Sequence, residues 1–162
     1  MKSALRVMCA FWVVMLLTSC NAEEKASCKS LLGNLPPEEV NTELKINAPP
    51  SFNSFRLGDD INLFADNYSH FPIEISPDKD LKVYWLQGNS WTETKNLVDY
   101  LSAVDRISVK SDSDPGGTTY SVTIDLSKRQ GAVRTCIILY GIKDPDRNRV
   151  KLASYIELTL QP

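Results

Sequence analysis

The chain has 162 residues, which is enough for one domain of ordinary size and short for two. Its residues are 43% hydrophobic and 23% charged, the proportions of a globular protein rather than a disordered or fibrous one. The formal net charge is -2 and the basic residues are scattered along the chain, which argues against a nucleic-acid partner.

The amino terminus has the three zones of a secretory signal peptide. Lys2 and Arg6 give it a positive start, residues 7–17 are apolar, and small residues follow. The apolar run is too short to cross a bilayer, which needs about 20 residues. Residues 1–19 are therefore predicted to be a signal peptide.

The tetrapeptide Leu17-Thr18-Ser19-Cys20 closes this segment and resembles the lipobox of bacterial lipoproteins. The resemblance implies that the Cys20 thiol receives a diacylglyceryl group and that the chain is cut just before Cys20. It also implies further acylation, with palmitate for example, and a protein anchored in membrane lipid on the outside of the cytoplasm, at the surface or in the periplasm. Two alternatives stay open, an ordinary secretory signal that contains a cysteine and a retained signal anchor.

Two cysteines would remain besides the lipidated one, since Cys9 lies in the discarded run. Cys28 and Cys136 would then sit in an exported, oxidising setting where a disulfide bond persists. We predict that they pair. The alternative is a buried free Cys136 and an idle Cys28.

Residues 20–42 are polar, contain Pro36-Pro37 and lack strand alternation, so they are predicted to be a tether between the lipid and the domain. A short helical turn around Leu31 and Leu32 is conceivable. A Cys28–Cys136 bond would pin the later half of this tether.

Residues 43–162 are predicted to form one antiparallel β-sandwich of about seven to nine strands. Short runs alternate between apolar and polar residues, and turn residues such as Gly88-Asn89 separate them. The expected strands lie in 43–48, 55–69, 71–76, 81–87, 90–96, 106–111, 119–127, 132–144 and 151–160. The run 94–107 fits a helical turn or an irregular loop equally well.

Two pieces of this domain are similar to immunoglobulin-like or fibronectin-like sandwich domains. Residues 58–75 resemble a pair of strands whose apolar alternation leads to an Asn and a corner, and residues 131–160 resemble the final hairpin. The chain departs from antibody-type domains because it lacks their Cys pair with a Trp between. Such a fold by itself implies adhesion, scaffolding or ligand binding without choosing among them.

Catalytic and metal-binding patterns are weak, so no enzyme and no cofactor are predicted. His70 is the single histidine, and the sequence has no Gly-x-Ser-x-Gly motif to supply a nucleophilic serine for it to activate. The run Asp144–Asn148 has the opening spacing of a calcium loop, but Arg149 stands where a glycine is needed. This run and residues 112–117 are better interpreted as hairpin turns.

The remaining candidates for function are aromatic. Trp85 and Trp91 flank the predicted hairpin and could face a glycan or protein partner, although one in the core and one at its edge is the simpler arrangement. The expected role is non-catalytic binding or structural support at the cell envelope. The alternatives are an accessory subunit of an envelope complex and a protease inhibitor of the β-sandwich type, with residues 112–117 as its inhibitory loop.

Overall fold

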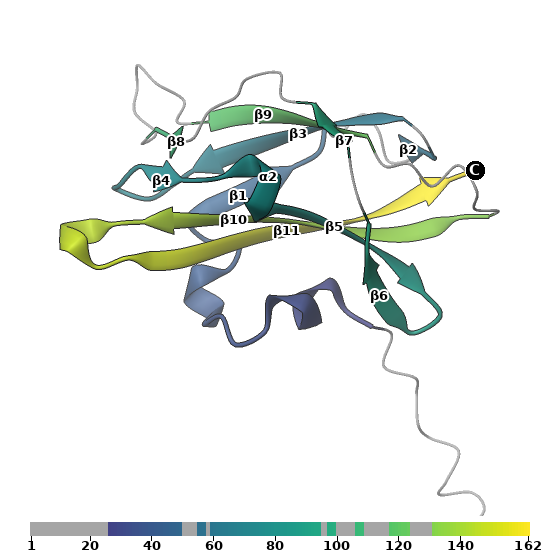
Figure 1. The fold of residues 1–162 in the computed structure, drawn as a ribbon, viewed down its shortest axis with the longest axis horizontal. Coiled ribbons are helices and arrows are strands. Elements are labelled where there is room, and N and C mark those ends of the chain that lie inside the picture. The colour runs from purple at the N-terminus through teal and green to yellow at the C-terminus, as the bar shows by residue number, and fades with distance from the viewer. Residues whose placement is uncertain are drawn as a thin grey trace, which may run out of the picture.

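The computed structural model describes residues 26–49, 55–57, 59–94, 97–99, 106–108, 117–123 and 131–162. Within them the protein is all-β, and two sheets pack face to face, so the predicted β-sandwich is confirmed (Figure 1). Eleven strands lie in these residues, where the sequence predicts seven to nine. The added strands come from the expected run 55–69, which contains two strands, and from 97–99, which lies in the undecided run 94–107.

The smaller sheet has the strand order β1 (Leu44–Asn47), β3 (Asp60–Asn67), β9 (Gly117–Thr123) and β7 (Leu97–Asp99), and all of its pairings are antiparallel. Strand β7 lies in the run that was undecided between a helical turn and a loop. Its described residues are extended and pair with β9, Val98 opposite Val122.

The larger sheet is built around the hairpin of β10 (Val133–Lys143) and β11 (Val150–Gln161), which pair along the full length of β10. Its order is β2 (Phe55–Arg56), β11, β10, β4 (Ile73–Glu74) and β8 (Arg106–Ile107), and β5 (Leu81–Gln87) joins β10 to β6 (Ser90–Glu93). The pairing of β2 with β11 is parallel, so the sandwich departs there from the antiparallel arrangement that the sequence predicts.

Turn chemistry fixes the hairpins where the sequence predicts them. Gly88 lies between β5 and β6 with a φ of +59°, a backbone conformation that glycine adopts without steric cost. The Asp144–Asn148 run contains the short 3₁₀ helix η3 (Pro145–Arg147) and connects β10 to β11. It is therefore a hairpin connection, as interpreted from its residues.

The core between the sheets consists of alternate residues from both. It holds Leu44, Ile46, Phe55, Ile61, Leu63, Ala65, Ile73, Ile75, Leu81, Val83, Trp85, Ile107, Val133, Ile137, Leu139, Leu152 and Leu160. Space is tightest at Gly141 on β10, where an added Cβ would lie 2.4 Å from Ile73 Cγ2 on the neighbouring strand β4 and 3.4 Å from Leu44 Cδ2 on the smaller sheet.

Asn67 makes the corner at which the chain passes from the smaller sheet to the larger one. Its side chain is fully buried, and Nδ2 donates to the carbonyl oxygens of Phe71 (2.9 Å) and Ile107 (3.1 Å). Its Oδ1 accepts from Ser69 N at 2.8 Å and from Ser69 Oγ at 2.7 Å. One side chain thus satisfies backbone groups that neither sheet pairs.

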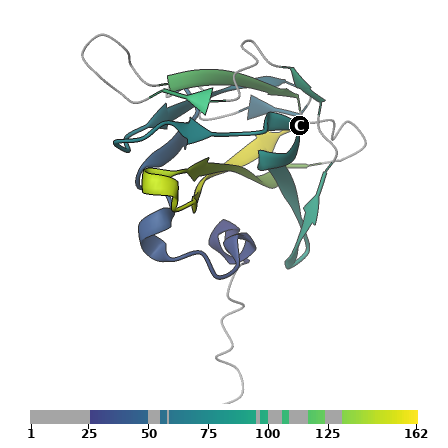
Figure 2. The same cartoon turned by 60° about the vertical axis from the view of Figure 1, so that its left-hand side comes forward.

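Residues 26–42 form a third layer on the outer face of the larger sheet (Figures 1 and 2), which we call the N-terminal layer. It contains two 3₁₀ helices, η1 (Cys28–Leu32) and η2 (Pro37–Glu39), and η1 is the helical turn expected near Leu31. The sequence assigns these residues to a tether, whereas from Ala26 onward they pack against the domain. The cause is the apolar set Leu31, Leu32, Leu35 and Val40, which has a sheet face to cover.

Candidate functional site

The first candidate site is the junction of the N-terminal layer with the larger sheet. Cys28 in η1 and Cys136 in β10 form a disulfide bond, their Cα atoms are 5.7 Å apart, and both residues are fully buried. The predicted pairing is therefore present. The bond joins positions 108 residues apart and holds η1 against the sheet.

Trp91 and Arg134 hold the residues that precede this disulfide. Trp91 Nε1 donates to the carbonyl oxygen of Ser27 at 3.2 Å, and an Arg134 guanidinium nitrogen donates to that of Ala26 at 3.4 Å. The guanidinium carbon of Arg134 lies 5.8 Å from the centre of the Trp91 ring, and its Nε donates to Glu157 at 2.8 Å. Trp91 is thus partly buried against the N-terminal layer, where it acts on the protein's own chain.

Trp85 has a different place from Trp91. Its side chain is 9% exposed and packs in the core between the two sheets. Tyr84, its neighbour, points to the other face of β5. There it packs against the apolar cluster between the larger sheet and the N-terminal layer, which consists of Cys28, Leu32, Cys136, Ile138 and Ala153. The simpler arrangement that the sequence allowed therefore holds for Trp85, which is in the core, whereas Trp91 packs on the outer face of the larger sheet.

Tyr84 and Tyr140 share the outer face of the larger sheet with Lys82, Glu93 and Lys151. Burial raises the pKa of both tyrosines, and the nearby Glu93 raises it further. The hydrogen bond from Lys82 Nζ to Glu93 (2.8 Å) raises the pKa of that lysine. Lys151 Nζ lies 4.3 Å from the centre of the Tyr140 ring. Because the pKa of each of these three groups is raised, Tyr84, Tyr140 and Lys82 keep their protons near neutral pH.

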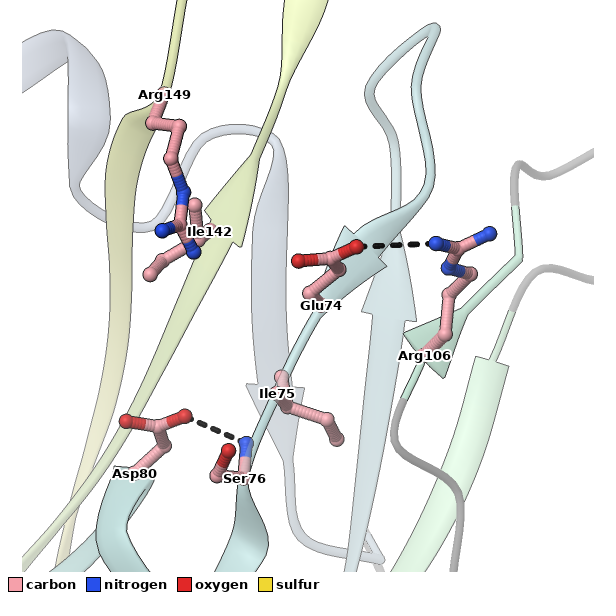
Figure 3. A pocket seen from close by; sticks show the side chains of 7 residues that line it. All are labelled: Glu74, Ile75, Ser76, Asp80, Arg106, Ile142 and Arg149. Atoms are coloured by element: carbon pink, nitrogen blue, oxygen red, sulfur yellow. Dashed lines mark hydrogen bonds and ion pairs between the residues drawn. The ribbon is translucent and has the colours of Figure 1, made fainter. Parts of the chain in front are cut away.

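The second candidate site is an open pocket of about 470 Å³ beside β4, shown in Figure 3. Glu74, Ile75, Ser76, Asp80, Arg106, Ile142 and Arg149 line it. Two of its charged groups are paired, Arg106 with Glu74 at 3.0 Å. Asp80, at the end of the short helix α2 (Pro77–Asp80), accepts from Ser76 N at 2.6 Å.

The lining residues of this pocket could hold an anionic group. Arg149 is exposed and lies over Ile142 in Figure 3, and the described part of the chain gives its guanidinium no ion pair. A carboxylate or phosphate group is the ligand that such a guanidinium takes. Ser76 is the one hydroxyl that lines the pocket, and none of the seven lining residues is a histidine that could activate it.

The other residues considered for chemistry do not converge. His70 is exposed in the turn after β3 and is not among the residues that line the pocket. Among the described residues no three His, Cys, Asp or Glu side chains are grouped closely enough to hold a metal ion. Cys20 and residues 112–116 lie outside the described residues.

Three exposed aromatic residues escaped the sequence analysis. Phe64, Tyr68 and Phe71 are 43%, 45% and 37% exposed, and Lys45 Nζ lies 4.8 Å from the centre of the Tyr68 ring. Phe64 could have been found, because it falls between Leu63 and Ala65, whose alternation assigns them to the core face. The other two lie at the corner, where no period applies.

Over the residues that the structure describes, none of the helices has the length and apolar character to cross a bilayer. No known protein family matches this chain, and no curated protein sequence matches it. The case for a function therefore depends on the chain's own residues.

Proposed function

We propose that this chain is a bacterial lipoprotein, anchored through acyl chains on Cys20, with a non-catalytic binding or structural role at the cell envelope. The observation that carries the proposal is the tetrapeptide Leu17–Cys20 behind a positively charged start and an apolar run. Two or three acyl chains would hold the protein durably, since each buried methylene contributes about 0.8 kcal/mol and one chain alone is marginal.

The disulfide bond supports export. Disulfides persist in oxidising compartments outside the cytoplasm and are rare inside it. The Cys28–Cys136 bond is fully buried and joins two layers of the fold, as a structural disulfide does. Its first cysteine, Cys28, lies only eight residues after Cys20, which would carry the lipid.

The pocket and the exposed aromatic residues support a binding role over a catalytic one. The pocket offers Arg149 to an anionic group, and its lining residues include no histidine to activate the hydroxyl of Ser76. Phe64 and Tyr68 present aromatic rings on the opposite sheet, and such rings are common in surfaces that bind proteins or glycans.

Metabolic labelling with palmitate tests the anchor. Cys20→Ser removes the thiol that would be acylated, so we expect no incorporated palmitate and a precursor that keeps its signal peptide. Cys9→Ser is the matched control, because it removes a thiol from the same segment and should leave labelling and processing unchanged. Normal cleavage of the Cys20→Ser chain, together with an unlabelled wild type, would overturn the proposal.

A further inference from the structure

We infer that the N-terminal layer rests against the hydrated surface of the bilayer and that the smaller sheet is held facing away from it. The inference rests on the proposed anchor at Cys20 and adds an orientation to it. The partner in question is the headgroup layer of the membrane that holds the acyl chains.

The length of the free chain carries the argument. If residues 20–42 were a free tether, the domain could stand roughly 75 Å from its anchor at full extension. The structure fixes the chain from Ala26 onward, however, and Ala26 is six residues from Cys20. Six residues span about 20 Å at most. The domain therefore has little freedom to move away from the bilayer.

Three independent contacts hold the point at which this short connection leaves the domain. They are the hydrogen bonds from Arg134 to Ala26 and from Trp91 to Ser27, and the disulfide at Cys28. All three lie on the outer face of the larger sheet, where the N-terminal layer packs (Figure 1). The connection therefore pulls on this face of the sandwich.

The outer side of the N-terminal layer suits contact with headgroups and not insertion. Ser27, Lys29, Ser30 and Asn34 are exposed there, whereas Leu32 is buried against the sheet. Polar residues of this kind lie well in the hydrated headgroup region and have no apolar surface to bury among acyl chains. The acyl chains would then provide the anchor and the protein surface would set the orientation.

The opposite face is the outer side of the smaller sheet, which the sandwich places beyond the larger sheet in both views (Figures 1 and 2). Asn62, Phe64 and Tyr68 are exposed on β3 and directly after it. Packed sheets lie about 10 Å apart, so these residues are at least that much farther from the membrane than the larger sheet. They face the aqueous compartment in which a partner would approach.

Energy transfer to a headgroup-labelled acceptor lipid in vesicles tests this orientation. Cys20 is acylated and Cys28 and Cys136 are paired, so a cysteine added at an exposed position is the thiol that takes the donor dye. Asn34→Cys labels the N-terminal layer and Asn62→Cys, the matched control, labels the smaller sheet. Glu38→Cys provides a second near position if Asn34→Cys does not fold.

We expect transfer from position 34 to be about twofold or more above transfer from position 62, because the second site lies beyond both sheets. Inserting 20 Gly and Ser residues between Asn21 and Ala22 should abolish the difference, since a long flexible linker frees the domain to rotate. Equal transfer from the two positions in vesicle-bound protein with the native connection would overturn the inference alone. Failure of the wild type to float with vesicles would overturn the anchor and the orientation together.

Discussion

Replacing Asn67 by aspartate should destabilise the fold although it exchanges only the side-chain NH₂ group for an oxygen. Nδ2 of Asn67 donates to the carbonyl oxygens of Phe71 and Ile107 in a site closed to solvent. A carboxylate has no proton to donate, so both carbonyl oxygens would lose the hydrogen bond from Nδ2 and face a negative charge. Ile107 O would lose the side-chain donor that it has here, whereas Phe71 O would keep its hydrogen bond from Ser69 Oγ. The acceptor side of the residue would still bind Ser69 N and Oγ.

The expected magnitude follows from those two lost bonds. A buried polar group left without a partner costs about 1–3 kcal/mol, so the loss at Ile107 O alone should reduce the free energy of unfolding of Asn67→Asp by roughly that amount at pH 7, and the lost bond to Phe71 O adds to it. A protonated carboxyl group can donate to one of the two carbonyls, so the folded state favours protonation and raises the pKa of the new group above its unfolded value of about 3.9. Protonation therefore restores its full contribution to stability at a pH below the unfolded-state pKa, and this contribution is lost as the pH rises through the folded-state pKa.

Urea denaturation at pH 7 and at pH 5 measures both effects. Asn62→Asp is the matched control because it makes the same change at an exposed position of the same strand, and we expect it to stay within about 0.5 kcal/mol of the wild type. The reasoning fails if Asn67→Asp is no less stable than Asn62→Asp at pH 7. It also fails if the deficit of Asn67→Asp increases as the pH falls.

Two further predictions concern the larger sheet. Replacing both Cys28 and Cys136 by serine should lower the free energy of unfolding by about 4–5 kcal/mol, which is the chain-entropy value for a loop of roughly 100 residues. An unchanged urea midpoint in the double variant would contradict this prediction. Thr135→Val should raise the free energy of unfolding by about 1 kcal/mol, because Thr135 Oγ1 is buried without a hydrogen-bond partner in the described part of the chain and valine has the same shape. Thr159→Val, at an exposed position, is the control. An equal change in the free energy of unfolding of the two variants would contradict the explanation.

The sandwich could be predicted because its longer strands keep a period of two. Residues 81–86 alternate between buried and half-buried, and residues 61–65 alternate between buried and exposed. Turn residues at Gly88-Asn89 and Asp144–Asn148 separate hairpin partners in the sequence, so these boundaries were also predictable. Strand β7 could not be found, because three residues contain too little of a period, and β2 could not be separated from β3 within the expected run 55–69.

The pocket beside β4 could not be predicted, because its residues come from parts of the chain that nothing in the sequence relates. Glu74 and Arg106 meet because β4 pairs with the two-residue strand β8. Arg149 joins them only because the β10–β11 hairpin returns past Ile142. A candidate binding site of this kind depends on strand order, which is a property of the whole fold.

Strand β10 has apolar residues on both faces, and this pattern indicates more than that the strand is central in its sheet. Ile137 and Leu139 enter the core between the sheets, and Cys136 and Ile138 face the other way. In a two-layer sandwich that outer face would meet water, so its apolar residues require a cover. The chain supplies the cover from its own amino-terminal end, and the disulfide at Cys136 keeps it in place. The same bond leaves a connection of six residues from Cys20 to Ala26, so under the anchor that we propose at Cys20 one pair of cysteines would close the second core and also limit how far the domain stands from the membrane.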